Sequence, residues 1–593
     1  GGSVAEVLGA ALETATDGGR RRAQGLHVTP AWLAGHLVGL ALDGLGPGAG
    51  PGGAPAMCDP ACGGGVFLVA AAERLHACGI PRAEVVRDLV WGADIDPVGL
   101  AAAEAALALW AGEAPPPGRL VVGDPLVHGA GVWPDRPAAG FDAVIGNPPF
   151  QNQLGRATAR SAADQGRLRE RFGPAVRPYT DTAWLFLLVG CELVRPGGRV
   201  ALVEPRSLIA ARDAEALRAA LDRCADLRRL WVDDGPVFAA AVRVCVPVLE
   251  RRPDAAEAAG EAGPAEEAGE AGPAEPRDGD GPHRPGPARP RGAGSGGAGD
   301  GGAGDGEPPA PDAAARPGPS DRWRGLWADA VGVPRLPAWA APTLGERATV
   351  VAGFRDEYYG LVGAVREHDP ADPPGAVAPL VTSGVIDWCA SSWGRRPVRY
   401  AKLRWQAPVV DLGRLASLPS SAARRWVART RRPKVVVATQ TRVVEAVVDA
   451  DGDWVPSVPT VAVLPREDAG EGTDLWHILA VLASPAATAW LLRRAAGTAL
   501  GVRALRVAAP DLAALPLPAD TVAWDDAAAA LRAAVDGHGP EAAAGHGPEA
   551  AAAAVDHYLV AVGAAYGTDA ALAAWWREQA GGPFGSATGG RVR

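Results

Sequence analysis

The chain has 593 residues, long enough for two or three domains with separate cores, which excludes a single small module. Its formal net charge is -10, yet thirteen basic residues and one acid fall within residues 391–443, while residues 251–320 hold thirteen acids and seven bases. The seven cysteines include no CxxC pair, which argues against a disulfide framework and a cysteine metal site. No apolar run has the length that a membrane span needs. We therefore expect a reduced, metal-free, cytoplasmic protein.

Residues 56–250 alternate short apolar runs with helical patterns rich in alanine and leucine, which is typical of a largely parallel sheet. The expected strands are Ala56–Cys58, Leu89–Gly92, Leu120–Val122, Ala143–Ile145, Val200–Val203, Leu230–Val232 and Val242–Leu249. The pattern predicts an α/β fold, a Rossmann-like sheet of seven strands, in a domain spanning residues 1–250.

The rest of the chain divides by composition. Residues 251–320 consist mainly of Ala, Gly, Pro, Glu and Asp, too little apolar surface to offset ordering entropy, which predicts a disordered acidic linker. Residues 321–520 combine β-rich runs such as "KVVVATQTRVVEAVV" with the helix-like "LWHILAVLASPAATAWLLRRA", which predicts a mixed α+β domain. Residues 521–593 contain a tandem "GHGPEAAA" repeat and are expected to end in a helical hairpin.

A glycine-rich turn follows the first expected strand in "MCDPACGGGVFL". Glycines let a ligand approach the backbone, and the N-terminus of the following helix offers unpaired N–H groups. The turn lacks both the GxGxxG spacing of pyrophosphate sites and the lysine of a P-loop. This combination favours a cofactor that carries a nucleoside but no phosphate.

Acidic residues follow the next two expected strands. Asp94 in "GADIDP" is expected to bind a ribose, although capping of a helix is the alternative role for acids at this position. Asp96, which precedes Pro97, is the better match to that capping role. Asp124 in "VVGDPL" is positioned to accept from the exocyclic amine of an adenine in the cofactor.

The stretch "FDAVIGNPPF" ends a buried strand with Asn147, Pro148, Pro149 and Phe150. The side-chain oxygen of Asn147 and the carbonyl of Pro148 can accept both hydrogens of an amino group, which leaves the nitrogen lone pair to attack an electrophilic methyl group. The prolines stiffen the turn and remove backbone donors. Phe150 offers a flat face on which a base can stack, a contact worth roughly 1–3 kcal/mol.

In this order, "DPACGGGVFL", "GADIDP", "GDPL" and "NPPF" resemble the motifs of the gamma-class adenine-N6 DNA methyltransferases, the family of type I modification subunits and TaqI-like enzymes. "GLHVTPAWLAGHLV" resembles the N-terminal cofactor motif of that family, and "DTAWLFLLVGCELVRPGGRVALVEPRSLI" resembles the segment after its catalytic loop. The resemblance spans roughly residues 25 to 250. Phe150 departs from the commoner Tyr, which keeps the stacking face but loses a hydroxyl.

The resemblance implies S-adenosyl-L-methionine as the methyl donor and an adenine flipped out of double-stranded DNA as the acceptor, with no metal ion. The residues it assigns to the cofactor are Thr29, Asp59, Pro60, Ala61, Cys62, Gly63, Gly65, Asp94 and Asp124. It also implies that the domain after the linker recognises DNA.

The basic window within residues 391–443 is the candidate DNA-binding surface, because arginine forks suit phosphates and guanine edges. Its expected DNA contacts are Arg395, Arg396, Arg399, Lys402, Arg404, Arg424, Arg425, Arg429, Arg431, Arg432 and Lys434, with Trp393, Trp405 and Trp426 interleaved. The alternative is a solvated face. The common PD-(D/E)xK nuclease core needs a lysine two residues after an acid, and neither lysine of this chain has an acid at that position. Any restriction endonuclease or defence subunit is therefore expected on a separate chain.

Other functions remain open at this point. A cytosine-N4 DNA methyltransferase would use similar motifs, although Asn at the first motif position favours adenine. Methyltransferases that act on RNA or on a protein glutamine also use NPP motifs, but they usually lack a large C-terminal domain. A catalytically idle DNA-binding subunit is the third alternative, and the intact NPP motif and glycine turn argue against it.

Overall fold

The computed structural model describes residues 29–150, 162–177, 179–233, 243–253, 319–466, 474–497, 501, 504–536 and 548–581. The expected linker and the first copy of the octapeptide repeat lie outside the described residues, apart from the ends of the linker, so their character stays a prediction. The domain boundaries also stay a prediction.

The N-terminal part is built on one sheet with the strand order β3-β2-β1-β4-β5-β8-β6, and β7 pairs with β8. Neighbouring strands from β1 to β5 run parallel, while β8 is antiparallel to both β5 and β7. The strands are β1 (Met57–Asp59), β2 (Val90–Asp94), β3 (Leu120–Val122), β4 (Phe141–Gly146), β5 (Val194–Leu202), β6 (Glu204–Pro205), β7 (Ala225–Val232) and β8 (Val244–Arg251). The predicted Rossmann-like α/β fold is confirmed, with the two-residue β6 as an additional strand.

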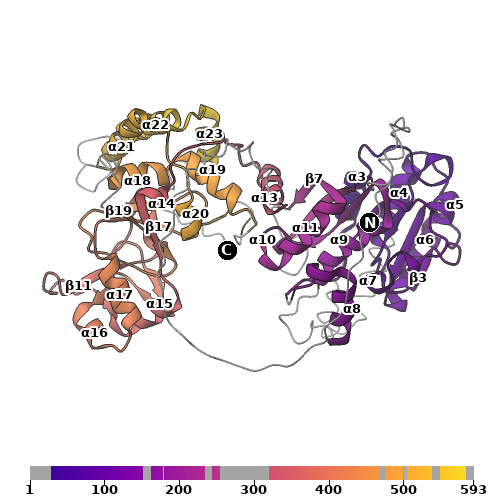
Figure 1. The fold of residues 1–593 in the computed structure, drawn as a ribbon, viewed down its shortest axis with the longest axis horizontal. Coiled ribbons are helices and arrows are strands. Elements are labelled where there is room, and N and C mark those ends of the chain that lie inside the picture. The colour runs from indigo at the N-terminus through magenta and orange to yellow at the C-terminus, as the bar shows by residue number, and fades with distance from the viewer. Residues whose placement is uncertain are drawn as a thin grey trace, which may run out of the picture. The chain divides into compact units, whose positions relative to one another are not determined.

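Helices cover both faces of this sheet, as Figure 1 shows. Successive residues of β4 alternate between the faces: Ala143 and Ile145 pack with α3, α4 and α6, whereas Val144 packs with α9 and α11. The helices are α3 (Ala31–Leu42), α4 (Val66–Ala77), α5 (Arg82–Glu84), α6 (Pro97–Ala111), α7 (Pro125–His128), α8 (Ala162–Phe172), α9 (Thr182–Leu193), α10 (Ser207–Ala210) and α11 (Glu215–Cys224).

The C-terminal part contains two four-stranded sheets, with the orders β10-β16-β11-β20 and β19-β17-β21-β9. Their strands are β9 (Ala348–Ala352), β10 (Val365–Glu367), β11 (Val377–Val381), β16 (Pro408–Asp411), β17 (Lys434–Ala438), β19 (Ala446–Asp449), β20 (Val455–Pro456) and β21 (Thr460–Pro465). Three short ladders are added by β12 (Ile386–Asp387) with β13 (Ala390–Ser391), β14 (Val398–Tyr400) with β15 (Leu403–Trp405), and β18 (Gln440–Thr441) with β22 (Leu505–Arg506). The mixture of strands and helices agrees with the expected α+β class.

The helices of this part are α13 (Pro319–Ala330), α14 (Leu344–Arg347), α15 (Arg355–Leu361), α16 (Leu412–Ser417), α17 (Ser421–Thr430), α18 (Leu475–Leu482), α19 (Pro485–Arg494), α20 (Ala509–Ala513), α21 (Thr521–Asp536), α22 (Pro548–Tyr566) and α23 (Ala570–Ala580). The expected closing helical hairpin is present as α22 and α23. The helix-like apolar stretch forms two helices that are separated at Ser484, whose hydroxyl accepts from the Ala487 N–H at 2.9 Å and caps α19. In the described part of the chain no single helix suits a membrane span; only the pair α18 and α19, bent by 60°, has the length and composition.

Candidate active site

The motifs meet at the carboxyl ends of the parallel strands. β1 lies between β2 and β4. The strands that follow β1 in sequence, β2 and β3, lie on one side of it, and β4 and β5 lie on the other side. Ligands of open α/β sheets bind at such a switch point, outside the carboxyl ends of the strands. Thr29 precedes α3, which packs over the same region, and its side chain is 6% exposed.

The glycine turn after β1 is shaped by close packing on one side and open space on the other. Gly65, with φ +81°, caps α4, and a Cβ there would lie 2.9 Å from the Ala103 Cα, so only glycine fits. Gly63, with φ +48°, has no atom within 4 Å of the Cβ position. A ligand can therefore approach the backbone at Gly63.

Asp59 begins this turn and is almost fully buried at 1% exposure. Its Oδ1 accepts from the Ala61 N–H at 3.0 Å. Burial raises the pKa of Asp59 to about 8, and the nearby Asp94 carboxylate contributes to the increase. Pro60 and Cys62 are also buried, whereas Ala61 is half-buried.

Asp94 connects the end of β2 to the glycine turn. Its Oδ2 accepts from the Gly63 N–H and its Oδ1 from the Asp96 N–H, each at 2.8 Å. Burial raises the pKa of Asp94. A carboxylate oxygen can accept more than one hydrogen bond, so the predicted contact to a ribose is compatible with this geometry and stays a prediction. The capping role predicted for Asp96 is confirmed, because its Oδ1 accepts from the Val98 N–H at 3.1 Å.

Asp124 follows β3 and caps α7, with its Oδ1 accepting from the Leu126 N–H at 2.9 Å. Sequence reasoning missed this cap, although Pro125 at the first helical position is the usual signal for one. The Gly123 N–H donates to the Asp94 carbonyl at 3.0 Å, which keeps Asp124 next to Asp94 at the sheet edge. Its role toward an adenine ring stays a prediction.

β4 ends against Asp59. A Cβ on Gly146, which has φ +154°, would lie 2.4 Å from Asp59 Oδ1, so no larger residue fits there without displacing the carboxyl group. The next residue, Asn147, donates from its Nδ2 to Thr29 Oγ1 at 3.0 Å. This bond turns the amide so that the buried Asn147 Oδ1 has no partner in the described structure. The predicted amine acceptor is therefore an unoccupied hydrogen-bond acceptor.

The rest of the NPPF motif is packed against the sheet. Pro148 is buried, and Pro149 and Phe150 are half-buried. Phe150 packs on the core cluster that α3 and α4 form with one face of the sheet. Thr29, Asp59, Gly63, Asp94 and Asn147 are thus brought together, while the expected roles of all motif residues stay predictions.

The residues of the basic window differ in their burial and in their hydrogen-bond partners. Lys434 is fully buried and forms an ion pair with Asp449, so the prediction that it contacts DNA is wrong. Four other members of the window are held by protein partners: Arg395, Arg396, Arg424 and Arg431. The exposed members that have no such partner among the described residues are Arg399, Lys402, Arg404, Arg425, Arg429 and Arg432.

The exposed bases lie mainly on two elements. Arg399 and Arg404 pair across the β14–β15 hairpin, and its two-residue turn, Ala401 and Lys402, has φ values of 49° and 66°. The Ala401 N–H donates to the Tyr358 hydroxyl at 2.9 Å, which supports this rarely populated conformation. The other element is α17, which shares one buried cluster with the hairpin through Tyr400 and Trp426.

The three tryptophans of the window have structural contacts. Each indole N–H donates to a backbone carbonyl: Trp393 to Pro408 at 3.0 Å, Trp405 to Tyr400 at 3.0 Å and Trp426 to Pro456 at 2.8 Å. Their rings therefore brace the fold around the basic residues.

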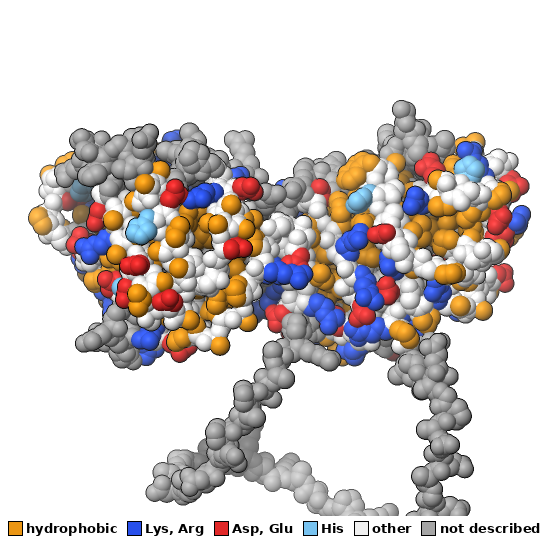
Figure 2. All heavy atoms as spheres, turned by 90° about the horizontal axis from the view of Figure 1, so that it is seen from above, with side chains coloured by type: hydrophobic (Ala, Val, Ile, Leu, Met, Phe, Trp, Pro, Cys, Tyr) orange, Lys and Arg blue, Asp and Glu red, His pale blue; other side chains and the backbone are white. Residues whose placement is uncertain are grey.

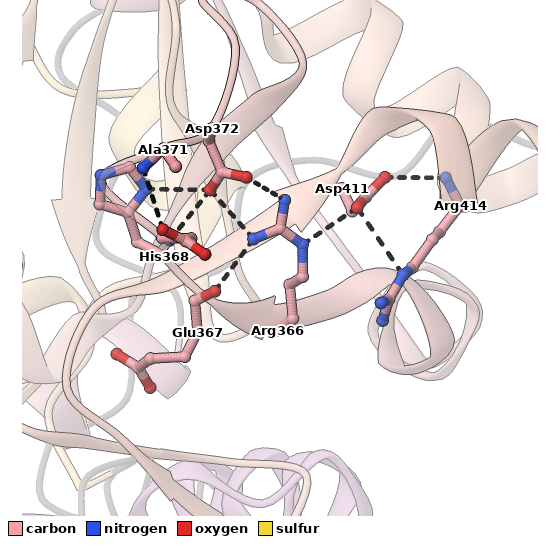
Figure 3. A network of polar contacts seen from close by, with 8 residues as sticks. Arg366, Glu367, His368, Ala371, Asp372, Asp411 and Arg414 are labelled. Carbon is pink, nitrogen blue, oxygen red and sulfur yellow. Dashed lines mark hydrogen bonds and ion pairs between the residues drawn. The ribbon is translucent and has the colours of Figure 1, made fainter.

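An ion-pair network fixes the strands next to the hairpin (Figure 3). The Arg366 guanidinium donates to Asp372 at 2.5 and 2.9 Å and to Asp411 at 3.0 Å, and the bonds to Arg366 lower the pKa of Asp372. The neighbouring Glu367 accepts from the backbone N–H groups of Gln406 and Ala407, which directly follow β15. The network therefore anchors the base of the hairpin.

No broad field of one sign covers the visible surface, since Figure 2 shows basic and acidic side chains intermixed over that face. A hollow of about 230 Å³ beside β5, β7 and β8 illustrates this mixture. Its Arg228 pairs with Glu250 at 2.7 Å and its Arg229 with Asp43 at 3.3 Å. This hollow is formed by salt bridges and contains none of the predicted site residues.

One further residue near the site was missed. Glu204 interrupts the apolar run "VALVEP" and is fully buried. A lone acid in such a run is the signal that sequence reasoning could have used.

Residues 25–225 match the model of the N-6 DNA Methylase family. This confirms, for that span, the resemblance to adenine-N6 DNA methyltransferases. The structure of the type IIL restriction-modification enzyme MmeI in complex with DNA is similar over 97% of this chain and 81% of that chain, with a TM-score of 0.53 and 14% identity, which supports a common fold. The structure of a type I restriction-modification methyltransferase subunit from Streptococcus thermophilus is similar over 38% of this chain and 45% of that chain, with 19% identity and a TM-score of 0.30. No curated protein sequence matches the chain.

Proposed function

We propose, from the match of residues 25–225 to the N-6 DNA methylases, that this chain is a site-specific DNA methyltransferase. It transfers a methyl group from S-adenosyl-L-methionine to the N6 amino group of adenine in double-stranded DNA. The observation that carries the proposal is the buried Asn147 Oδ1, which has no partner and lies at the carboxyl end of β4 beside Pro148. A restriction-modification or phage-defence setting, a cytoplasmic location and a separate endonuclease are parts of the same proposal.

The residues at the glycine turn fit S-adenosyl-L-methionine. The open space over Gly63 admits a ligand close to the backbone, and Asp94 and Asp124 lie at neighbouring strand ends to meet its ribose and adenine. When bound, the cofactor supplies an electrophilic methyl group on a sulfonium centre. Thr29 holds the Asn147 amide, so the cofactor motif and the catalytic motif are joined by one hydrogen bond.

The chain's own contribution to the reaction is orientation. Asn147 Oδ1 and the Pro148 carbonyl accept the two amino hydrogens, so the nitrogen lone pair points away from the ring plane toward the methyl group. As positive charge develops on the nitrogen, the same two oxygens stabilise it. Phe150 stacks on the flipped base, which offsets part of the few kcal/mol that flipping costs.

DNA contact is assigned to the exposed basic residues of the C-terminal part. The β14–β15 hairpin presents Arg399, Lys402 and Arg404, and α17 adds Arg425 and Arg429. The hairpin has no acid of its own, and the Glu367 contacts anchor its base. A rigid basic hairpin suits a groove lined by phosphates.

A methyl-transfer assay with radiolabelled S-adenosyl-L-methionine and genomic DNA tests the proposal. We expect label in DNA with the wild type and at least a hundredfold less with Asn147→Ala, because an electrostatic contact of this kind contributes about 10²–10³ in rate. Hydrolysis of the DNA to nucleosides would identify N6-methyladenine. Label on cytosine, RNA or protein instead of adenine would refute the proposed acceptor, and equal label from Asn147→Ala would refute the mechanism.

A further inference from the structure

In the part of the chain that the structure describes, the buried side-chain oxygens without a hydrogen-bond partner belong to two residues, Asn147 and Glu204. Asn147 has one such oxygen and Glu204 has two. A buried acceptor that lacks a donor destabilises the fold, so each one requires an explanation. The proposed reaction explains Asn147 Oδ1 as an acceptor for the amine, but it leaves the Glu204 carboxyl group unused.

Glu204 lies at the same edge of the sheet as Asn147. Leu202 of β5 pairs with Gly146 of β4, and the Val203 N–H donates to the Gly146 carbonyl at 3.0 Å. Asn147 is the first residue after Gly146 and Glu204 is the second after Leu202, so both lie just beyond the paired ends of two adjacent parallel strands. This edge is where the target base enters in the proposed reaction.

The surroundings of Glu204 favour its neutral form. The side chain is fully buried, and burial together with the charge of Asp181 at the start of α9 raises the pKa of Glu204 well above its usual range. Cys245 of β8 pairs with Glu204 across the strands, and its pKa is also raised by burial. The guanidinium of Arg206 faces the Trp327 ring at 5.5 Å, and the Arg206 N–H donates to the Arg243 carbonyl at 2.9 Å.

We infer that Glu204 contacts the flipped base as a neutral carboxylic acid and donates its hydrogen to a ring nitrogen next to the amino group. A neutral acid can donate to the unprotonated ring nitrogen of adenine or cytosine, while the two amino hydrogens stay with Asn147 Oδ1 and the Pro148 carbonyl. Guanine and thymine carry a hydrogen on the corresponding ring nitrogen, so a donor in this position repels them. Glu204 is then a specificity-determining residue. The inference rests on the proposed function.

The test compares two substitutions in the full-length protein. Glu204→Gln keeps a donor and an acceptor of the same shape, whereas Glu204→Leu removes both. We expect Glu204→Gln to retain kcat/KM for DNA within about threefold and Glu204→Leu to lose about tenfold or more, mainly through KM, since one hydrogen bond is worth about a factor of ten. Glu192→Gln, an exposed carboxyl-to-amide change on α9, is the matched control.

The pH profile provides an independent readout. The KM of the wild type for DNA should rise at high pH, as the Glu204 carboxyl group ionises and loses its donor, whereas the KM of Glu204→Gln should stay level. Wild-type kinetics for Glu204→Leu would overturn the inference, and so would loss of activity in Glu204→Gln with an unchanged melting temperature. Failure of the wild type itself to methylate DNA would refute the proposed function instead.

Discussion

At Gly146 there is no room for a side chain beside the Asp59 carboxyl group, since a methyl group there would lie 2.4 Å from Asp59 Oδ1. Gly146→Ala must move either the carboxyl group or Asn147, whose amide is the proposed acceptor for the amine. We expect at least a tenfold loss of methyl transfer and a loss of about 1–3 kcal/mol in unfolding free energy, the usual cost of overpacking. Methyl-transfer kinetics and thermal melting measure the two effects.

Gly35→Ala is the matched control for this change. Gly35 is exposed in α3, and no atom lies within 4 Å of its Cβ position. Alanine there should leave activity unchanged and stabilise the helix by about 0.5–1 kcal/mol. A similar activity loss in both variants would contradict the assignment of a close contact at Gly146.

The Asp59 carboxyl group predicts a pH dependence of stability. Its pKa is raised from 3.8 to about 8 on folding, so between these values the folded chain binds one proton more than the unfolded chain. The stabilisation by the neutral carboxyl group is complete below about pH 4 and is lost as the pH rises toward 8. Relative to Asp59→Asn, the wild type should therefore melt at progressively lower temperature from pH 5 to pH 8. A constant difference between the two proteins would contradict this expectation, and Glu113→Gln is an exposed control.

Among the elements, the β14–β15 hairpin carries the clearest prediction about DNA. Replacing Arg399 and Arg404 by Ala should weaken DNA binding and reduce the slope of log affinity against log salt by about one for each phosphate contact that is lost. Titrations of labelled duplex DNA at several salt concentrations measure both quantities. The double variant Arg74→Ala with Arg82→Ala, on α4 and α5, is the control, and equal slopes for the two double variants would reject the hairpin.

The turn of the hairpin allows charge and shape to be separated. Ala401 and Lys402 both have positive φ, a conformation that Asn-Gly adopts more readily than Ala-Lys. Replacing the pair by Asn-Gly should raise the melting temperature while weakening DNA binding, because the Lys402 charge is removed and the turn is kept. Unchanged DNA affinity would show that Lys402 does not contact DNA.

Elements with a simple local pattern were predictable from the sequence, and those that depend on distant partners were not. β3 agrees with its predicted range, whereas β5 begins at Val194 because Phe141 pairs with it across the bulge before Ala143. The glycine turn and the NPP motif lie close together as expected, since the carboxyl ends of parallel strands meet at the same edge of a sheet. The burial of Lys434 could not be predicted, because it depends on Asp449 on a neighbouring strand.

At the scale of the whole molecule, the composition of residues 251–320 predicts a disordered linker between two folded parts, and this segment lies outside the described residues except at its ends. Limited digestion with trypsin tests the prediction. The linker contains Arg277 and Arg291, neither of which precedes a proline, and disordered segments are cleaved first. Mass spectrometry should therefore find early cuts at these residues, while first cuts within α11 or β17 would contradict the predicted organisation.

The burial of Lys434 has a practical consequence for the whole chain. The sequence contains two lysines, and the other, Lys402, is exposed at the tip of the basic hairpin. Apart from the terminal amine, an amine-reactive dye should therefore attach to the folded protein at Lys402. Lys402 is thus a native lysine reporter at the proposed DNA surface, and protection of its amine from acetylation would report DNA contact without any engineered residue.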